Sequence, residues 1–301
     1  KDLSLSDRFK KRGFNKIKLI DPKKDLFISK KNYLIETIQH KFQAGNLNNY
    51  NHKSKYKFLF ARHIFEHVGN LDIFLKNAMF IIQNNGYLLL EIPDCNRAIN
   101  TGDPTLYWEE HNYYFTSDTF KNFLKKRNYK LIYFKKFKDR LENCLVAIIQ
   151  NKKKFNYKSN LHNKKNLLSI YFKYLKNNFK LTQKFFGKIG KDAKIVIYGA
   201  SHLTFTFIDL MEIGNYIRFV IDDDIHKKNL FAPVNNIKIT SFNDIKSKKI
   251  DYFLLGLNPN HHKKLIIKLK PFYPKSIFLS IFPQTNNYYL DHKIRIKKNG
   301  L

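Results

Sequence analysis

Residues 194–202 read Lys-Ile-Val-Ile-Tyr-Gly-Ala-Ser-His, an apolar run that ends at a glycine and is followed by small and polar residues. This pattern predicts a buried strand, a tight turn at Gly199 and the start of a helix. A second apolar run at 219–221 ends in the three aspartates 222–224. A strand that ends in acids after a strand–turn–helix unit is typical of dinucleotide-binding folds, but Gly199 is the one residue of their glycine-rich loop that is present. Cofactor binding and a purely structural role both remain open for this unit.

The same alternation extends along the rest of the chain. Apolar runs predict strands at 17–22, 56–63, 87–92, 130–137, 143–149, 252–259 and 277–283. Amphipathic stretches predict helices at 3–14, 32–40, 71–82 and 117–127, and a turn is expected at 84–86. Alternating strands and helices predict an α/β protein whose sheets are mostly parallel and carry helices on both faces.

A change in composition near residue 151 divides the chain, which at 301 residues is long enough for two domains. Residues 152–191 are rich in Lys and Asn and carry an apolar stripe from Leu167 to Phe185. This pattern predicts a polar linker followed by a helix packed between two domains, although contact with RNA or a membrane is an alternative. We therefore expect domains at 1–150 and 192–301, joined by a linker and bridging helix at 151–191.

The chain carries 56 Lys and Arg against 24 Asp and Glu, a formal net charge of +32. This charge is compatible with a polyanionic partner, but the basic residues are spread along the chain, and Lys, Asn, Ile, Phe and Tyr all have A/T-rich codons. Nucleic-acid binding is kept as an alternative that predicts affinity falling steeply with salt. Two cysteines, no secretory leader and no apolar run of about 18 residues predict a cytoplasmic protein without a disulfide scaffold or membrane span.

The stretch at 107–115, Tyr-Trp-Glu-Glu-His-Asn-Tyr-Tyr-Phe, gathers aromatic rings, two carboxylates and one imidazole. It lies between a predicted strand and a predicted helix, and loops after buried strands are where α/β proteins place their chemistry. His111 is the side chain best suited to proton transfer near neutral pH. The alternative is an aromatic loop that covers the end of the sheet, with His111 as a hydrogen-bonded filler.

A second polar cluster lies where the strand at 56–63 passes into a helix. His63 and His67 are four residues apart and could form a pair of metal ligands beside Glu66. No third ligand is obvious, and a residue in a strand does not keep helical spacing with residues beyond it. We therefore expect no metal site in this chain, and we place the side chains near Arg62 and His63 along a ligand crevice.

Taken together, these segments resemble class I S-adenosylmethionine-dependent methyltransferases of the sugar C-methyltransferase type. Residues 61–68 resemble the family's Arg-His-Val-Leu-Glu-His segment, and Glu-Ile-Pro-Asp at 91–94 resembles the end of its next strand. Residues 110–115 fit its Glu-His-x-x-Tyr-Phe signature. Residues 198–202 and 220–223 resemble the opening of its C-terminal domain.

This resemblance implies a Rossmann-like methyltransferase core without its first strand, a helical linker and a second Rossmann-like α/β domain. It implies that Asp21 holds the ribose of the methyl donor, S-adenosyl-L-methionine, and that Asn46 lies near the adenine. Arg62 and His63 would flank the donor.

The resemblance also implies a reaction. His111, oriented by Glu110, would remove a proton next to a ketone on a nucleotide-activated sugar, and the resulting carbanion equivalent would take the methyl group. A neighbouring hydrogen-bond donor must stabilise the enolate oxygen. A nucleotide-diphosphate sugar would also make use of some of the surplus Lys and Arg.

Two departures from the family pattern stand out. The family's glycine-rich loop, its first strand and its zinc-binding cysteines should lie upstream of Asp2, but the sequence starts at Lys1. We interpret the chain either as an N-terminal truncation, with zinc in the missing segment only, or as a degenerate methyltransferase fold that acts as a basic nucleic-acid-binding module. Trp108 stands where relatives commonly carry Tyr, so the phenolic hydroxyl is lost there.

Overall fold

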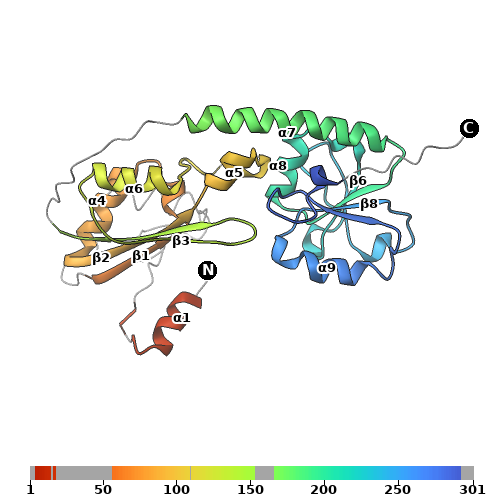
Figure 1. Cartoon of the computed structure of the whole chain (residues 1–301). Coiled ribbons are helices and arrows are strands. Elements are labelled where there is room, and N and C mark those ends of the chain that lie inside the picture. The colour runs from red at the N-terminus through yellow and green to blue at the C-terminus, as the bar shows by residue number, and fades with distance from the viewer. Residues whose placement is uncertain (1–3, 15, 18–55, 109, 153–165, 293–301) are drawn as a thin grey trace, which may run out of the picture.

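Two α/β units, each built around its own sheet, make up the computed structural model of the chain (Figure 1). The structure describes residues 4–14, 16–17, 56–108, 110–152 and 166–292. The long helix α7 (Leu167–Ile189) runs alongside both units. No helix in these described ranges is long and apolar enough to cross a membrane.

The first unit contains a four-stranded sheet with the strand order β1-β2-β4-β3. Its strands are β1 (Tyr56–Arg62), β2 (Ile82–Pro93), β3 (Lys130–Phe137) and β4 (Cys144–Gln150). β1 and β2 are parallel, whereas β4 is antiparallel to both of its neighbours. The expectation of a mostly parallel sheet is therefore wrong for these strands. The physical reason is the short connection between β3 and β4, because a parallel pair would need a long crossover segment.

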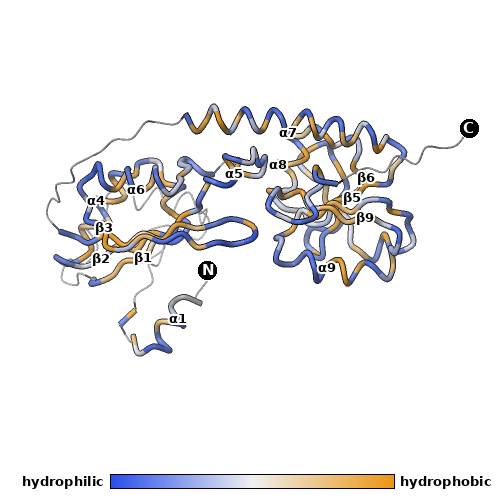
Figure 2. Tube along the Cα trace, viewed as in Figure 1, coloured by the Kyte–Doolittle hydropathy of each residue, from blue (hydrophilic) through white to orange (hydrophobic). Residues whose placement is uncertain are grey.

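Two amphipathic helices, α4 (Leu71–Ile81) and α6 (Ser117–Lys126), cover one face of this sheet (Figure 1). Asn70 caps α4, since its side chain accepts hydrogen bonds from the first free backbone N–H groups, and Thr116 caps α6 in the same way. The middle of the sheet is hydrophobic (Figure 2). Fully buried core side chains between helices and sheet include Phe65, Leu75, Leu88, Leu90, Phe120 and Ala147.

The turn predicted at 84–86 is wrong. β2 begins at Ile82, directly after α4, so these residues belong to a strand. Asn85 nevertheless adopts a left-handed conformation with a φ of 61°, and the pairing of β1 with β2 shifts register between Tyr56 and Phe58. The turn residues therefore mark an irregular start of the strand, where the ladder is locally disrupted.

At the N-terminus, α1 (Ser4–Lys11) ends just before Gly13, whose φ of +86° is the left-handed conformation that stops a helix. The predicted helical stretch at 3–14 is thus confirmed. Apart from Ile17, the strand expected at 17–22 lies outside the described residues, as do Asp21 and Asn46.

The second unit contains a sheet of five parallel strands in the order β7-β6-β5-β8-β9. Its elements are β5 (Ile195–Tyr198), α8 (His202–Leu210), β6 (Ile217–Ile221), β7 (Ile239–Thr240), β8 (Tyr252–Leu255), α9 (His262–Leu269) and β9 (Ile277–Ser280). Every residue of β5 is buried, because separate clusters of apolar side chains pack on the two faces of the sheet. This burial explains the unbroken apolar run of the sequence.

Gly199 forms the tight turn after β5. Its φ is +108°, and an added Cβ would lie 2.9 Å from the backbone nitrogen of Leu257. No other residue fits this conformation and this close approach of two loops. The turn brings the N-terminus of α8, capped by the Ser201 side chain, to the edge of the sheet where β6 and β8 also end.

The helix α7 contacts both units. Near its start, the Tyr171 hydroxyl donates to the Asp103 carbonyl oxygen (3.1 Å), close to the short helix α5 (Asn96–Thr101). Near its end, Phe185 and Phe186 are buried in the core of the second unit. The predicted bridging helix is therefore observed. Large apolar side chains along the helix are exposed at Leu168, Phe172, Tyr174 and Leu181.

Candidate functional site

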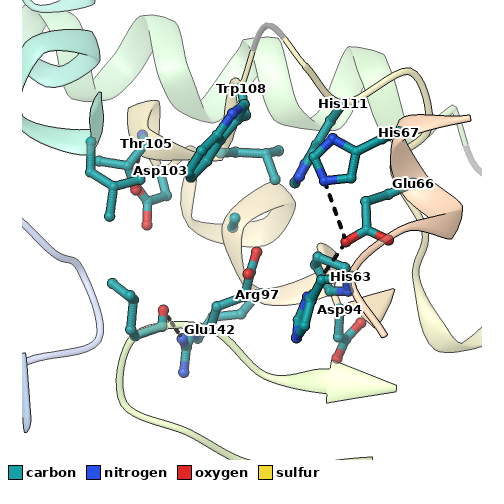
Figure 3. A pocket seen from close by; sticks show the side chains of 15 residues that line it. His63, Glu66, His67, Asp94, Arg97, Asp103, Thr105, Trp108, His111 and Glu142 are labelled. Carbon is teal, nitrogen blue, oxygen red and sulfur yellow. Dashed lines mark hydrogen bonds and ion pairs between the residues drawn. The ribbon is translucent and has the colours of Figure 1, made fainter. Parts of the chain in front are cut away.

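A cavity of about 290 Å³ opens beyond the carboxyl ends of β1 and β2. Leu203 of α8 also lines it, so both units contribute to its wall. In Figure 3, Trp108, His111 and His67 lie along one side of the cavity, and His63, Arg97 and Glu142 along the other. Its ionisable lining consists of three imidazoles, four carboxylates and one guanidinium: His63, His67, His111, Glu66, Asp94, Asp103, Glu142 and Arg97.

His63 lies at the end of β1 in a left-handed conformation with a φ of 48°. This conformation costs a residue with a Cβ about 1–3 kcal/mol, and such strain is concentrated at functional sites. The Arg62 guanidinium is held by the Glu91 carboxylate through Nε (2.5 Å) and Nη2 (3.1 Å). The predicted crevice residue His63 therefore lines the cavity, whereas the charge of Arg62 is paired with an acid on the neighbouring strand.

Glu66 is a buried carboxylate at the centre of the site. It is 2% exposed, and among the described residues neither of its carboxylate oxygens has a hydrogen-bond partner. The nearest charged or chargeable groups are His63 Nδ1 at 3.5 Å and His67 Nε2 at 3.9 Å. A buried charge needs such a partner, and contact with Glu66 accordingly raises the pKa of His63, against the opposing effect of burial.

His67 is held by the loop that contains Glu110. Its Nδ1 lies 3.0 Å from the carbonyl oxygen of Glu110. Because a carbonyl oxygen only accepts, Nδ1 carries the proton, and Nε2 faces Glu66. The Glu110 carboxylate is 4.0 Å from the same Nδ1. Within the described part of the chain, the contacts of the Glu110 side chain thus run to His67.

His111 is positioned by aromatic rings. Its ring stacks on Trp108, with centroids 5.6 Å apart and an interplanar angle of 14°. His67 meets it edge-on at 4.6 Å, and Tyr114 at 5.8 Å. Burial lowers the pKa of His111 to about 4, and the neighbouring His67 acts in the same direction. The imidazole is therefore neutral at physiological pH, with a free electron pair that can accept a proton.

Three of these residues also form a candidate ligand set for a metal ion. Glu66, His67 and His111 each offer one ligand atom, and these atoms lie within 4.8 Å of one another. Two imidazoles and a carboxylate form a ligand set found in zinc sites. The sequence suggested only His63 with His67, because His111 comes from a distant loop that the fold brings to the same place.

Sequence reasoning assigned no role to Asp94, Arg97 or Glu142, although all three line the cavity. Asp94 directly follows β2 and is 3% exposed, and its position after a buried strand was a usable signal. Glu142 comes from the connection between β3 and β4. Desolvation raises the pKa of Glu142 to about 7, so its charge changes near neutral pH. Nothing in the sequence pattern marks this acid, because only the β3–β4 hairpin brings it to the cavity.

The contact between Glu66 and His63 predicts a pH-dependent stability. Because the pKa of His63 is raised in the folded protein, its stabilising contribution is fully present below the unfolded pKa of about 6.5 and is lost as pH rises through the folded value. We expect Glu66→Gln to lower the melting temperature more at pH 6 than at pH 8.5. Glu212→Gln, the same change at an exposed site, should behave alike at both pH values. An equal loss at both pH values for Glu66→Gln would contradict the assignment.

Comparison with known families agrees with this architecture. The family described as "Methyltransferase domain" matches residues 4–133, and the family described as "C-methyltransferase C-terminal domain" matches residues 168–281. No curated protein matches the chain. With the two domains in this order, the chain is an S-adenosylmethionine-dependent methyltransferase. It belongs to the C-methyltransferase family.

The buried carboxylate of Glu66 would suit the positive sulfonium of a methyl donor. The wall of the cavity holds four carboxylates against one guanidinium, and Arg97 already donates to the carbonyl oxygens of Asp139 and Leu141. A cationic ligand would meet a favourable field from Glu66, whose buried carboxylate has no hydrogen bond among the described residues. Of the residues expected to bind the donor, His63 lines this cavity, Arg62 is paired with Glu91, and Asp21 and Asn46 lie outside the described part.

Proposed function

We propose that the enzyme methylates a carbon next to a ketone on a nucleotide-activated sugar, with His111 as the general base. The observation that supports this most is a neutral imidazole, His111, in a cavity that both domains line. A carbon–carbon bond can form only after a proton leaves the attacking carbon, and a base with a free electron pair must be within reach. The donor, when bound, supplies an electrophilic methyl group on sulfur.

The neighbouring residues have roles in this proposal. His111 takes the proton, and the electron pair left on the acceptor is delocalised onto the ketone oxygen as an enolate. The buried carboxylate of Glu66 then stabilises the imidazolium, because its charge favours the protonated form of His111. His63, whose pKa is raised, is the candidate donor of a hydrogen bond to the enolate oxygen. Glu110 acts on His111 indirectly, since its carboxylate and its carbonyl both lie against His67.

The lining of the cavity supports a sugar as its occupant. Carboxylates accept hydrogen bonds from hydroxyl groups, and Asp94, Asp103 and Glu142 surround the open space. A diphosphate needs cations, and Arg97 is the one guanidinium among the lining residues. We therefore place the sugar ring in the cavity and the diphosphate outside it.

The same proposal includes the domain limits given by the sequence, with a methyltransferase core at 1–150, a linker and bridging helix at 151–191 and a C-terminal domain at 192–301. The two sheets have separate apolar cores, which supports two domains. The last turns of α7 contribute Phe185 and Phe186 to the second core, so this helix would stay with the C-terminal domain if the chain were cut.

Donor binding tests the proposal independently of the acceptor. We expect S-adenosylhomocysteine to bind in a calorimetric titration and Asp21→Ala to weaken it at least tenfold, because hydrogen bonds from ribose hydroxyls to a carboxylate are each worth about 1.5–3 kcal/mol. Asp118→Ala, which removes an exposed acid at the start of α6, is the matched control and should leave the affinity unchanged. Equal affinity of the two variants for S-adenosylhomocysteine would show that Asp21 does not bind the donor.

A further inference from the structure

His202 links the C-terminal unit to the loop that carries the proposed base. It is the first residue of α8, and its Nε2 lies 3.2 Å from the carbonyl oxygen of Tyr107 in the first unit. Since that oxygen only accepts, Nε2 carries the proton and donates the hydrogen bond. The Thr206 hydroxyl oxygen, one turn along α8, lies 3.2 Å from the same nitrogen, where it is a second acceptor for that one N–H. The imidazole of α8 therefore holds the backbone of the first unit.

The ring of His202 continues a stack of three aromatic rings. Its centroid is 4.6 Å from that of Trp108, at an interplanar angle of 30°. The indole of Trp108 stacks in turn on His111. Trp108 thus lies between an imidazole of the second unit and the imidazole that we propose as the base. Offset stacking of this kind fixes the plane of a ring, and each pair adds about 0.5–1.5 kcal/mol.

The Tyr114 hydroxyl fixes the backbone of the same loop. The Tyr114 hydroxyl accepts from the Trp108 backbone N–H (3.1 Å) and donates to its carbonyl oxygen (3.0 Å). The backbone N–H of His111 also donates to that carbonyl, at 3.0 Å. Tyr114 therefore fixes the backbone position of Trp108. The orientation of the indole ring depends on the rings that it contacts. On the side away from His111, that contact is His202.

We propose that His202 is a positioning residue that orients His111 through Trp108, so that the C-terminal domain completes the active site of the methyltransferase core. This inference rests on the proposed role of His111. It gives the second domain a physical part in the reaction, because the base can remove a proton only when its nitrogen points at the acceptor carbon. A displacement of about 1 Å in such a group can lower the rate roughly 100-fold.

Kinetics of two variants test the positioning role. His202→Ala removes the ring and the hydrogen bond, and we expect kcat to fall roughly 10- to 100-fold with the KM for the donor unchanged. His202→Phe keeps a ring for stacking and should recover most of kcat. His226→Ala, at an exposed histidine of the same unit, is the matched control.

Fluorescence tests the stack without turnover. Trp108 is the one tryptophan of the chain, so its emission reports this site alone. We expect His202→Ala to shift and change the emission, and His202→Phe and His226→Ala to resemble the parent protein. Changed emission and a lower kcat in His202→Ala, with kcat recovered in His202→Phe, support the proposal. A folded His202→Ala variant with unchanged kcat overturns it, as does a lower kcat that His202→Phe does not recover. If His111→Asn retains full turnover, His111 is not the base. In that case the emission of His202→Ala still shows whether His202 stacks on Trp108, so the two failures can be told apart.

Discussion

Replacing His111 with Asn is expected to lower kcat by about 10²- to 10⁴-fold, the range that general base catalysis contributes. Asn keeps a polar side chain of similar reach but cannot accept and hold a proton. The affinity for S-adenosylhomocysteine should remain that of the parent protein, because the donor site does not depend on proton transfer. A lower kcat with unchanged donor affinity would therefore locate the defect in the chemical step.

Proton removal can be measured apart from methyl transfer. In deuterated water, and with S-adenosylhomocysteine in place of the donor, the parent enzyme should exchange the acceptor proton next to the ketone, and His111→Asn should not. His226→Asn, at an exposed histidine, is the matched control for both measurements. Parent-like exchange in His111→Asn would exclude His111 as the base.

The pH dependence provides a second check on His111. Because burial lowers its pKa to about 4, the base remains unprotonated through the neutral range. Turnover should therefore fall on the acid side only as pH drops toward about 4, well below the value of about 6.5 for an ordinary histidine. If turnover instead falls near pH 6.5, and this fall disappears in His63→Gln, then His63 is the group that must be unprotonated for turnover.

Replacing Phe65 with Ala is expected to lower the free energy of unfolding of the first unit by about 3–5 kcal/mol, the usual cost of removing a buried Phe ring. The ring is 0% exposed and lies within 6.1 Å of Phe74, Phe115 and Phe120, centroid to centroid. No other side chain can fill this space without movement of α4 or α6. Urea unfolding followed by the emission of Trp108 measures the change in the unit that contains it.

The same substitution should also affect the site, because Phe65 directly precedes Glu66 and His67. A cavity beneath this turn allows the buried carboxylate to move relative to its imidazole partners, so a loss of activity should accompany the loss of stability. Phe172→Ala on α7 is the matched control, since that ring is 56% exposed, and it should change the stability by no more than about 0.5 kcal/mol. Equal effects of the two substitutions would show that the aromatic cluster does not support the site.

The sequence by itself determined the class of fold and many of the described elements. Buried strands such as β5 are read from unbroken apolar runs, and helices such as α6 from their periodicity and caps, because both signals are local. The left-handed turn at Gly199 is likewise a local requirement. The motifs at 61–68 and 110–115 led to the methyltransferase family, which the family comparison confirms.

Only the tertiary structure decided how these motifs meet. The direction of β4, the burial of Glu66 and the presence of Glu142 in the cavity depend on contacts between distant segments, which no local pattern encodes. The partner of the Glu110 carboxylate was likewise decided by the tertiary structure. Its neighbour in the sequence is His111, but its contact in space is His67, because side chains on successive loop residues diverge. The stack of His202 on Trp108 joins two domains, so the fold of the whole chain was needed to reveal it.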